Sequence, residues 1–240
     1  KDTFEKFSEA RVPIESRHHA EIEGAIRRRG FETCAFYKSI RHVHKPPYPD
    51  RWGIFYIGQA VEHVASRIRD QYPAYGDPYN LSLEFLRRHE RFHFGADIQT
   101  LLFEAARKKH MYMPIRNALK NHRTHFVEEA LANKAAWDWA KQKRTGLKEF
   151  AEDFMSVQPN AYARFQEPKL ELASEWAATV VEQQQVGTSI DSDFKHWVCA
   201  TPDHLMNKSL CPEWYVDVAD ISKWISPAFR LPIVTSVVDS

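Results

Sequence analysis

Apolar side chains recur along much of the chain at the three- and four-residue spacing of an amphipathic helix. The clearest stretch is 59–71, where one face carries Val61, Val64, Ala65 and Ile68. Capping residues, glycines and prolines set the limits of further helices at 17–28, 80 to about 110 with a break near Gly95, 121–143, 147–155 and 168–185. The pattern therefore predicts a chain built mainly of helices.

Short runs of aromatic and β-branched residues predict a small number of strands. They lie at 31–37, 52–57, 214–218 and 233–238. Three prolines make 42–50 a loop between the first two strands. We therefore predict a helix-rich α+β fold with a small early sheet that later strands join. A length of 240 residues fits a single domain, which can divide into lobes 1–110 and 111–240 with a cleft between them.

Composition and charge narrow the classes of protein that fit. A hydrophobic content of 43% excludes disorder as the main state. The net charge of +1 gives no drive toward nucleic acid, and no apolar run reaches the roughly 18–20 residues that span a bilayer. Three widely spaced cysteines favour a reducing, cytoplasmic location. The chain begins at Lys1, so the sequence leaves open whether a targeting segment has been removed.

The segment His89-Glu90-Arg91-Phe92-His93 has the pattern HExxH. Histidines four residues apart lie on one helix face, where both rings can reach a zinc ion at about 2.0–2.1 Å. Glu90 lies roughly 100° around the helix from His89, angled toward a metal-bound water as a general base requires. The alternative for the pentapeptide alone is a solvated helix face, because Arg87, Arg88 and Arg91 surround it.

Downstream, a predicted helix contains Glu128-Glu129-Ala130-Leu131-Ala132-Asn133. With the HExxH segment, this resembles the gluzincins, the zinc metallopeptidases typified by thermolysin, over residues 85–135. The resemblance implies that Glu129 is the third ligand of one Zn²⁺ and that Asn133 and Asp97 support the histidines. Two departures are the 36-residue step from His93 to Glu129 and an asparagine where the family has an aspartate. We place Glu129 inward because it shares a helix face with Phe126 and Asn133, and expect Glu128 to be exposed.

The expected activity is peptide-bond hydrolysis. Zinc would lower the pKa of its bound water toward about 7 and polarise the scissile carbonyl, and Glu90 would pass the water's proton to the leaving amine. The resemblance implies an oxyanion donor from a downstream Tyr or His, for which the candidates are Tyr162, His204 and, more weakly, His196. The strand at 52–57 is either an edge strand that holds an extended peptide or an ordinary buried strand.

Two other classes of protein remain open. Glu15 to His18 and Glu90 to His93 both read ExxH, the pattern of a ferritin-like di-iron bundle, although the order of motifs differs from that fold. The chain can also be a non-catalytic interaction module with a decayed HExxH. The pairs His18–His19, His42–His44 and His122–His125 are read as scattered histidines without metal. We expect a protein or peptide substrate of restricted range, and neither nucleic acid nor membrane as partner; the sequence does not predict the oligomeric state.

Overall fold

The computed structural model describes residues 3–6, 16–45, 48, 50–73, 76–108, 125–143, 146–169, 171–172, 175 and 211–217, and all that follows concerns these residues. Four strands form one mixed sheet in the order β1 (Thr3–Lys6), β4 (Glu213–Asp217), β3 (Gly53–Ile57) and β2 (Ala35–Lys38). β3 pairs antiparallel with β2 and parallel with β4, and β4 pairs antiparallel with β1. The strand β2 is therefore an edge of the described sheet.

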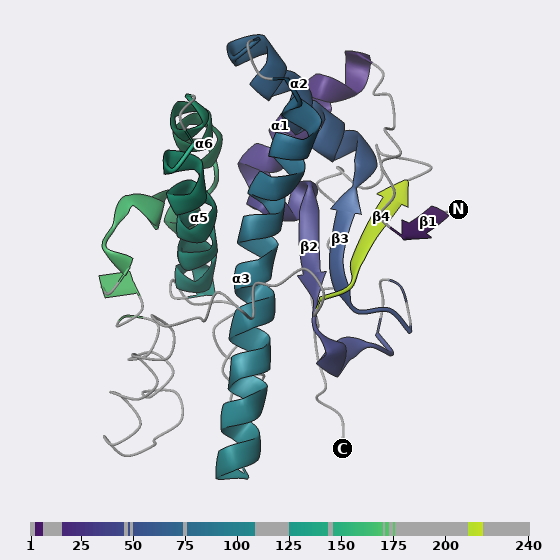
Figure 1. Cartoon of the computed structure of the whole chain (residues 1–240), viewed down its shortest axis with the longest axis vertical. Helices are drawn as coiled ribbons and strands as arrows, with labels where there is room; N and C mark the ends of the chain where they lie inside the picture. The colour runs from purple at the N-terminus through teal and green to yellow at the C-terminus, as the bar shows by residue number, and fades with distance from the viewer. Residues whose placement is uncertain are drawn as a thin grey trace.

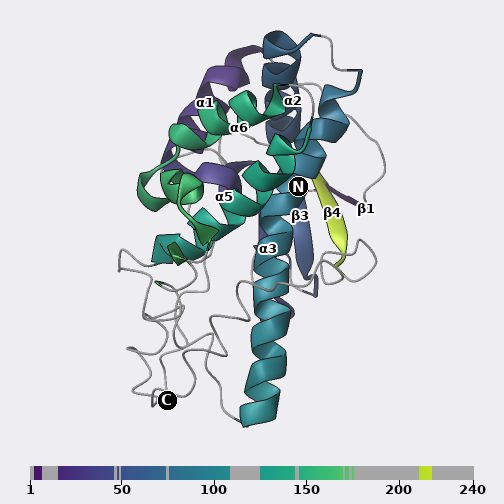
Figure 2. The same ribbon diagram turned by 60° about the vertical axis from the view of Figure 1, so that its left-hand side comes forward.

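A 30-residue helix, α3 (Pro78–Arg107), separates the sheet from the later helices (Figure 1). The sheet lies on one side of α3, and α5 (His125–Lys141) and α6 (Leu147–Ser156) lie on the other. Figure 2 shows α1 (Ser16–Arg29) and α2 (Gly58–Gln71) gathered with α6 around the first half of α3. Short 3₁₀ helices cover Gly30–Thr33, Ile40–His42 and Asn160–Gln166.

Local sequence explains where α3 begins and ends. The Asp77 side chain accepts a hydrogen bond from the backbone N–H of Asn80 at 3.1 Å, and Pro78 occupies the first turn. Lys108 ends the helix in the left-handed conformation, with φ of 53°. The expected break near Gly95 is wrong, because α3 continues through that buried position. A helical glycine costs only about 1 kcal/mol relative to alanine, which packing can offset.

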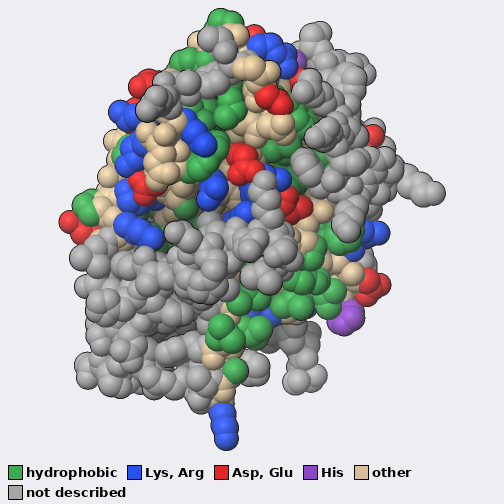
Figure 3. Space-filling view, in the orientation of Figure 1, with side chains coloured by type: hydrophobic (Ala, Val, Ile, Leu, Met, Phe, Trp, Pro, Cys, Tyr) green, Lys and Arg blue, Asp and Glu red, His purple; other side chains and the backbone are tan. Residues whose placement is uncertain are grey.

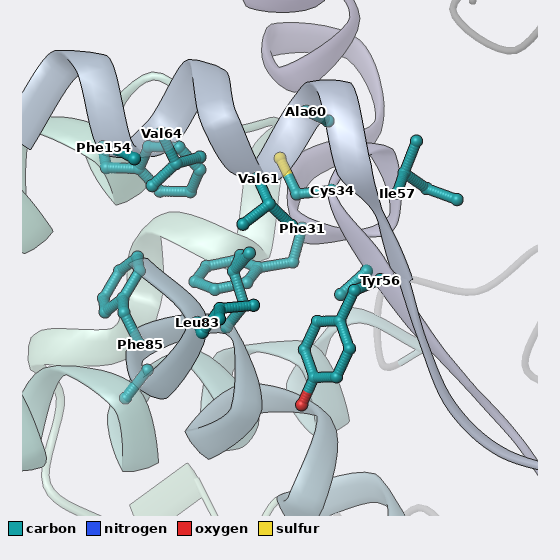
Figure 4. Packing of buried hydrophobic residues seen from close by; sticks show 14 of the residues in the cluster. Phe31, Cys34, Tyr56, Ile57, Ala60, Val61, Val64, Leu83, Phe85 and Phe154 are labelled. Carbon is teal, nitrogen blue, oxygen red and sulfur yellow. The ribbon is translucent and has the colours of Figure 1, made fainter. Parts of the chain in front are cut away.

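The apolar core lies between the first half of α3 and the elements that surround it. Figure 4 shows Phe31 among Val61, Leu83 and Phe85, all buried. The Phe31 ring lies 5.2 Å from the Phe85 ring and 5.3 Å from the Phe154 ring. Strand, helix and 3₁₀ segments therefore share one core along the first half of α3.

The helix-rich α+β class is confirmed, with three corrections in the sheet region. Residues 31–37 do not form one strand, because Gly30 has φ of +66° and opens a 3₁₀ turn before β2. The strand predicted at 52–57 is interior and fully buried, so the edge position considered for it is wrong. β1 was not anticipated. The segment 233–238 and most of 168–185 lie outside the described residues.

The fold also bears on the alternatives. A sheet between the two ExxH segments is incompatible with a ferritin-like four-helix bundle. No helix among the described residues is both long enough and apolar enough to cross a membrane. On the face shown in Figure 3, basic and acidic side chains are interspersed, as the near balance of charges leads one to expect.

Candidate metal centre

The two histidines of the HExxH segment stand one turn apart on the buried middle of α3. His89 and His93 are 1% and 4% exposed, and their Nε2 atoms lie 3.2 Å apart. The spacing follows from the helix itself, since residues four apart share a face. Together with Glu90, they form a buried His–Glu–His group that could hold a metal ion.

Helix α5 packs against α3 and adds a carboxylate to this pair. Glu129 Oε2 lies 3.2 Å from His89 Nε2 and 3.3 Å from His93 Nε2. The three atoms thus form a nearly equilateral triangle, buried on all sides. Glu129 Oε2 makes no hydrogen bond of good geometry with any described residue.

The triangle has the dimensions of a metal site. Donor atoms bound tetrahedrally at about 2.0 Å are separated by about 3.3 Å, so three donors at 3.2–3.3 Å match one face of that tetrahedron. Two nitrogens and one carboxylate oxygen are also a donor set that zinc accepts. A buried carboxylate requires a counter-charge, and a metal cation would provide one.

Glu128 contacts His93 from behind. Its Oε1 lies 2.8 Å from His93 Nδ1, and the residue is 6% exposed. The expectation that Glu128 is solvent-exposed is therefore wrong. Both acids at the start of α5 approach α3, one at each nitrogen of the same ring. A carboxylate on Nδ1 fixes the tautomer that leaves Nε2 available to a metal.

His89 is held by an aromatic ring and an amide. The Phe31 ring stacks on the imidazole with centroids 4.0 Å apart and planes 5° from parallel. His89 Nδ1 and Asn133 Oδ1 are both buried, and the neighbouring Asn133 side chain partly offsets the effect of burial, which lowers the pKa of His89. The amide nitrogen of Asn133 donates to the backbone oxygen of Tyr162 at 2.9 Å and to Gln158 Oε1 at 3.2 Å. Asn133 thus stands beside the predicted ligand, whereas nothing in the sequence singled out Phe31.

Burial and mutual contact set the charges of the centre. Burial lowers the pKa of His89. Burial acts in the same direction on His93, but Glu129 and Glu128 outweigh it and raise the pKa of that ring well above its usual value. Burial alone would raise the pKa of Glu129, yet His93 and His89 hold it well below the usual range. Without metal, the centre is therefore a His93⁺–Glu129⁻ pair, with Glu128 at the far side of the ring.

Glu90 lies beside the triangle, with Oε1 4.0 Å from His89 Nε2. Burial raises the pKa of Glu90 to about 8, although His93 and the backbone N–H of Tyr37 in β2 each act to lower that pKa. A carboxyl with a pKa near neutrality can both take and return a proton at physiological pH. The chain therefore supplies an acid–base group next to the candidate ligands.

Asp97, one turn beyond His93, has other partners. Its carboxylate accepts hydrogen bonds from Tyr37 Oη at 2.9 Å, Ser39 Oγ at 2.5 Å and Arg41 Nε at 2.8 Å. Among the described residues, these donors belong to β2 and the turn after it, and none is a candidate ligand. Asp97 thus links the edge strand β2 to α3 through hydrogen bonds. Its predicted role in supporting the histidines rests on the resemblance alone.

The candidate oxyanion donors remain predictions. Tyr162 is buried, and its backbone oxygen accepts a hydrogen bond from Asn133, which places the residue near the centre. Its ring packs against Gly30, where a Cβ would lie 2.9 Å from Tyr162 Cε1. His204 and His196 lie outside the described residues.

Comparisons with protein-family models, with curated proteins and with solved structures find no match for this chain. The assignment of the centre therefore depends on its own geometry.

Proposed function

We propose that this chain is a zinc-dependent metallopeptidase with a zincin-like core, in which His89, His93 and Glu129 bind one Zn²⁺. The observation that carries the proposal is the buried triangle of two imidazole nitrogens and one carboxylate oxygen, 3.2–3.3 Å on each side. Three protein ligands leave a fourth position for water or substrate, the arrangement of catalytic rather than structural zinc.

Zinc held by these three residues would supply a Lewis acid and make a water molecule acidic near neutral pH. Glu90 is the general base, since it is the titratable side chain next to the triangle and its pKa is about 8. It takes the proton from the attacking water and returns it to the leaving nitrogen. Glu128 and Phe31 hold the two imidazoles in place.

The edge strand supports the choice of a peptide as substrate. β2 has a neighbour on only one side among the described strands, and its Tyr37 N–H reaches Glu90. Most of β2 is buried and its Tyr37 N–H is directed to Glu90, so we propose that an extended peptide pairs with the remaining main-chain groups of this edge, which places its carbonyl groups near the base. We propose a restricted protein substrate, because a peptidase of broad range would damage its host cell.

Elemental analysis of the purified chain, followed by a cleavage screen that compares the parent with Glu90→Gln, tests the proposal. We expect about one zinc per chain in both proteins, and cleavage products only with the parent. The matched control is Glu84→Gln, a partly exposed acid earlier on α3 that pairs with Arg87, which should cleave like the parent. Zinc-loaded parent without any cleavage would favour the non-catalytic interaction module, and cleavage by Glu90→Gln at the parental rate would remove Glu90 as the base.

A further inference from the structure

A second pair of histidines converges at a separate place in the fold, between α1 and α2. His19 Nδ1 lies 2.9 Å from His63 Nδ1, and the ring centroids are 5.1 Å apart. His63 is 4% exposed, whereas His19 is half-buried and reachable from solvent. His63 was not among the histidines that the sequence suggested, because it stands between Val61 and Val64 in the stretch read as an apolar helix face.

A carboxylate orients the buried ring. His63 Nε2 lies 3.2 Å from Glu23 Oε2, and Arg67 holds the same oxygen at 3.0 Å. Arg27 holds the other oxygen of Glu23 at 3.2 Å. With Nε2–H donated to Glu23, Nδ1 of His63 presents its lone pair toward His19. This is the carboxylate–histidine arrangement that typically stands behind a metal-binding imidazole.

The surroundings favour a cation. Glu62 and Asp70 on α2 act on His19 as negative charges, and Glu62 Oε2 is buried without a hydrogen-bond partner among the described residues. In the metal-free chain one of the two Nδ1 atoms donates a hydrogen bond to the other, and a metal ion would take the place of that proton. Arg67 and Arg27 are paired with Glu23, and Arg69 is paired with the other oxygen of Glu62, Oε1.

We propose that His19 and His63 form a second metal site, which binds one late first-row divalent cation of the Ni²⁺ or Cu²⁺ kind through the two Nδ1 atoms, with water at the remaining positions. The spacing supports this class of ion. Neighbouring donors at about 2.0–2.1 Å from a square-planar or octahedral ion are about 2.8–3.0 Å apart, whereas a tetrahedral ion separates them by about 3.3 Å. The 2.9 Å between His19 and His63 matches the first value, and the triangle around His89 matches the second.

Titration of the full-length chain with NiCl₂ tests this site, after removal of bound metal and reloading with one equivalent of Zn²⁺. We expect one Ni²⁺ per chain, with affinity reduced about tenfold or more in His19→Ala and in Glu23→Gln. The control His44→Ala removes an exposed histidine whose partner is Asp50, and should bind Ni²⁺ like the parent. His19 is preferred to His63 for the substitution because the half-buried ring leaves the core intact.

Two further readouts separate this site from the candidate zinc centre. Ni²⁺ should raise the melting temperature of the parent but not that of His19→Ala, since only a bound ligand stabilises the folded state. The variant His89→Ala should keep its Ni²⁺ site, whether or not the chain is a peptidase. Ni²⁺ binding that survives His19→Ala unchanged, or that disappears in His89→Ala alone, would overturn the proposal.

Discussion

Each imidazole of the candidate centre contributes its Nε2 atom to the triangle. The rest of the ring is held by a different kind of group in each of the two histidines. His93 has the carboxylate of Glu128, and His89 has the ring of Phe31 and the amide of Asn133. A carboxylate makes its imidazole a more basic ligand than an amide does. His93 should therefore be the stronger of the two nitrogen ligands.

We expect Glu128→Gln to weaken zinc binding by about 10–100-fold, because an amide replaces the charge behind His93. Competition against a chromophoric chelator measures this affinity. Asp138→Asn is the matched control, since this partly exposed acid on the same helix pairs with Lys141. Equal affinity in the Glu128 variant and the parent would show that the carboxylate does not tune the ligand.

Glu90 should give the metal-free protein a characteristic pH dependence. Its pKa is about 8 in the folded chain against an ordinary value of 4.5, so the folded state binds the extra proton between these values. The free energy of unfolding should therefore fall as pH rises from about 4.5 to about 8, by on the order of 3–5 kcal/mol in total. Denaturant titrations of the parent and Glu90→Gln isolate this effect, because the variant cannot titrate. Parallel curves for the two proteins would contradict it.

At the scale of elements, amphipathic spacing located the helices well, and α2 and α6 begin and end within one residue of their expected limits. The spacing gave the wrong structure where a single backbone angle determines whether a segment is a strand or a turn. Gly30 at φ of +66° converts the start of an aromatic, strand-like run into a 3₁₀ turn, and this turn carries Phe31 onto His89. Likewise, HExxH spacing predicted the histidine pair from one helix, but the inward position of Glu128 depends on how α5 meets α3, which periodicity does not specify.

Two glycine substitutions should have opposite effects on stability. Gly30→Ala should destabilise the fold by about 1–3 kcal/mol, because its backbone angle is unfavourable for alanine and Tyr162 occupies the space of a Cβ. Gly24→Ala, inside α1, should stabilise it by about 0.5–1 kcal/mol, since only the flexible end of Arg28 lies near. Chemical denaturation compares both with the parent. Similar stability of the two variants would mean that the turn at residue 30 adapts.

At the scale of the whole molecule, the candidate centre joins the two stretches of chain that the sequence analysis assigned to separate lobes. The imidazoles belong to α3 and the carboxylates to α5, and residues 109–124, which connect these helices, lie outside the described residues. A cation bound by both helices would therefore contribute directly to their association, because binding is coupled to folding.

If the centre holds zinc as proposed, its removal by a chelator should loosen α5 more than α2. We expect faster amide hydrogen exchange along 127–133 in the metal-free chain, and little change along 60–68, which packs in the apolar core. Exchange followed by mass spectrometry resolves the two segments. A uniform change along the chain would indicate that metal acts on global stability alone.

Under the proposed function, the double attachment of β2 to α3 has a consequence for where a substrate would be cut. Tyr37 reaches Glu90 through its backbone N–H and Asp97 through its hydroxyl, and Ser39 and Arg41 add to the same carboxylate. These contacts hold the strand and the base at a fixed offset from each other. A polypeptide paired with this edge would be cleaved a fixed number of residues from the residue that pairs with β2. The cleavage position would therefore depend on main-chain alignment more than on the identity of the flanking side chains.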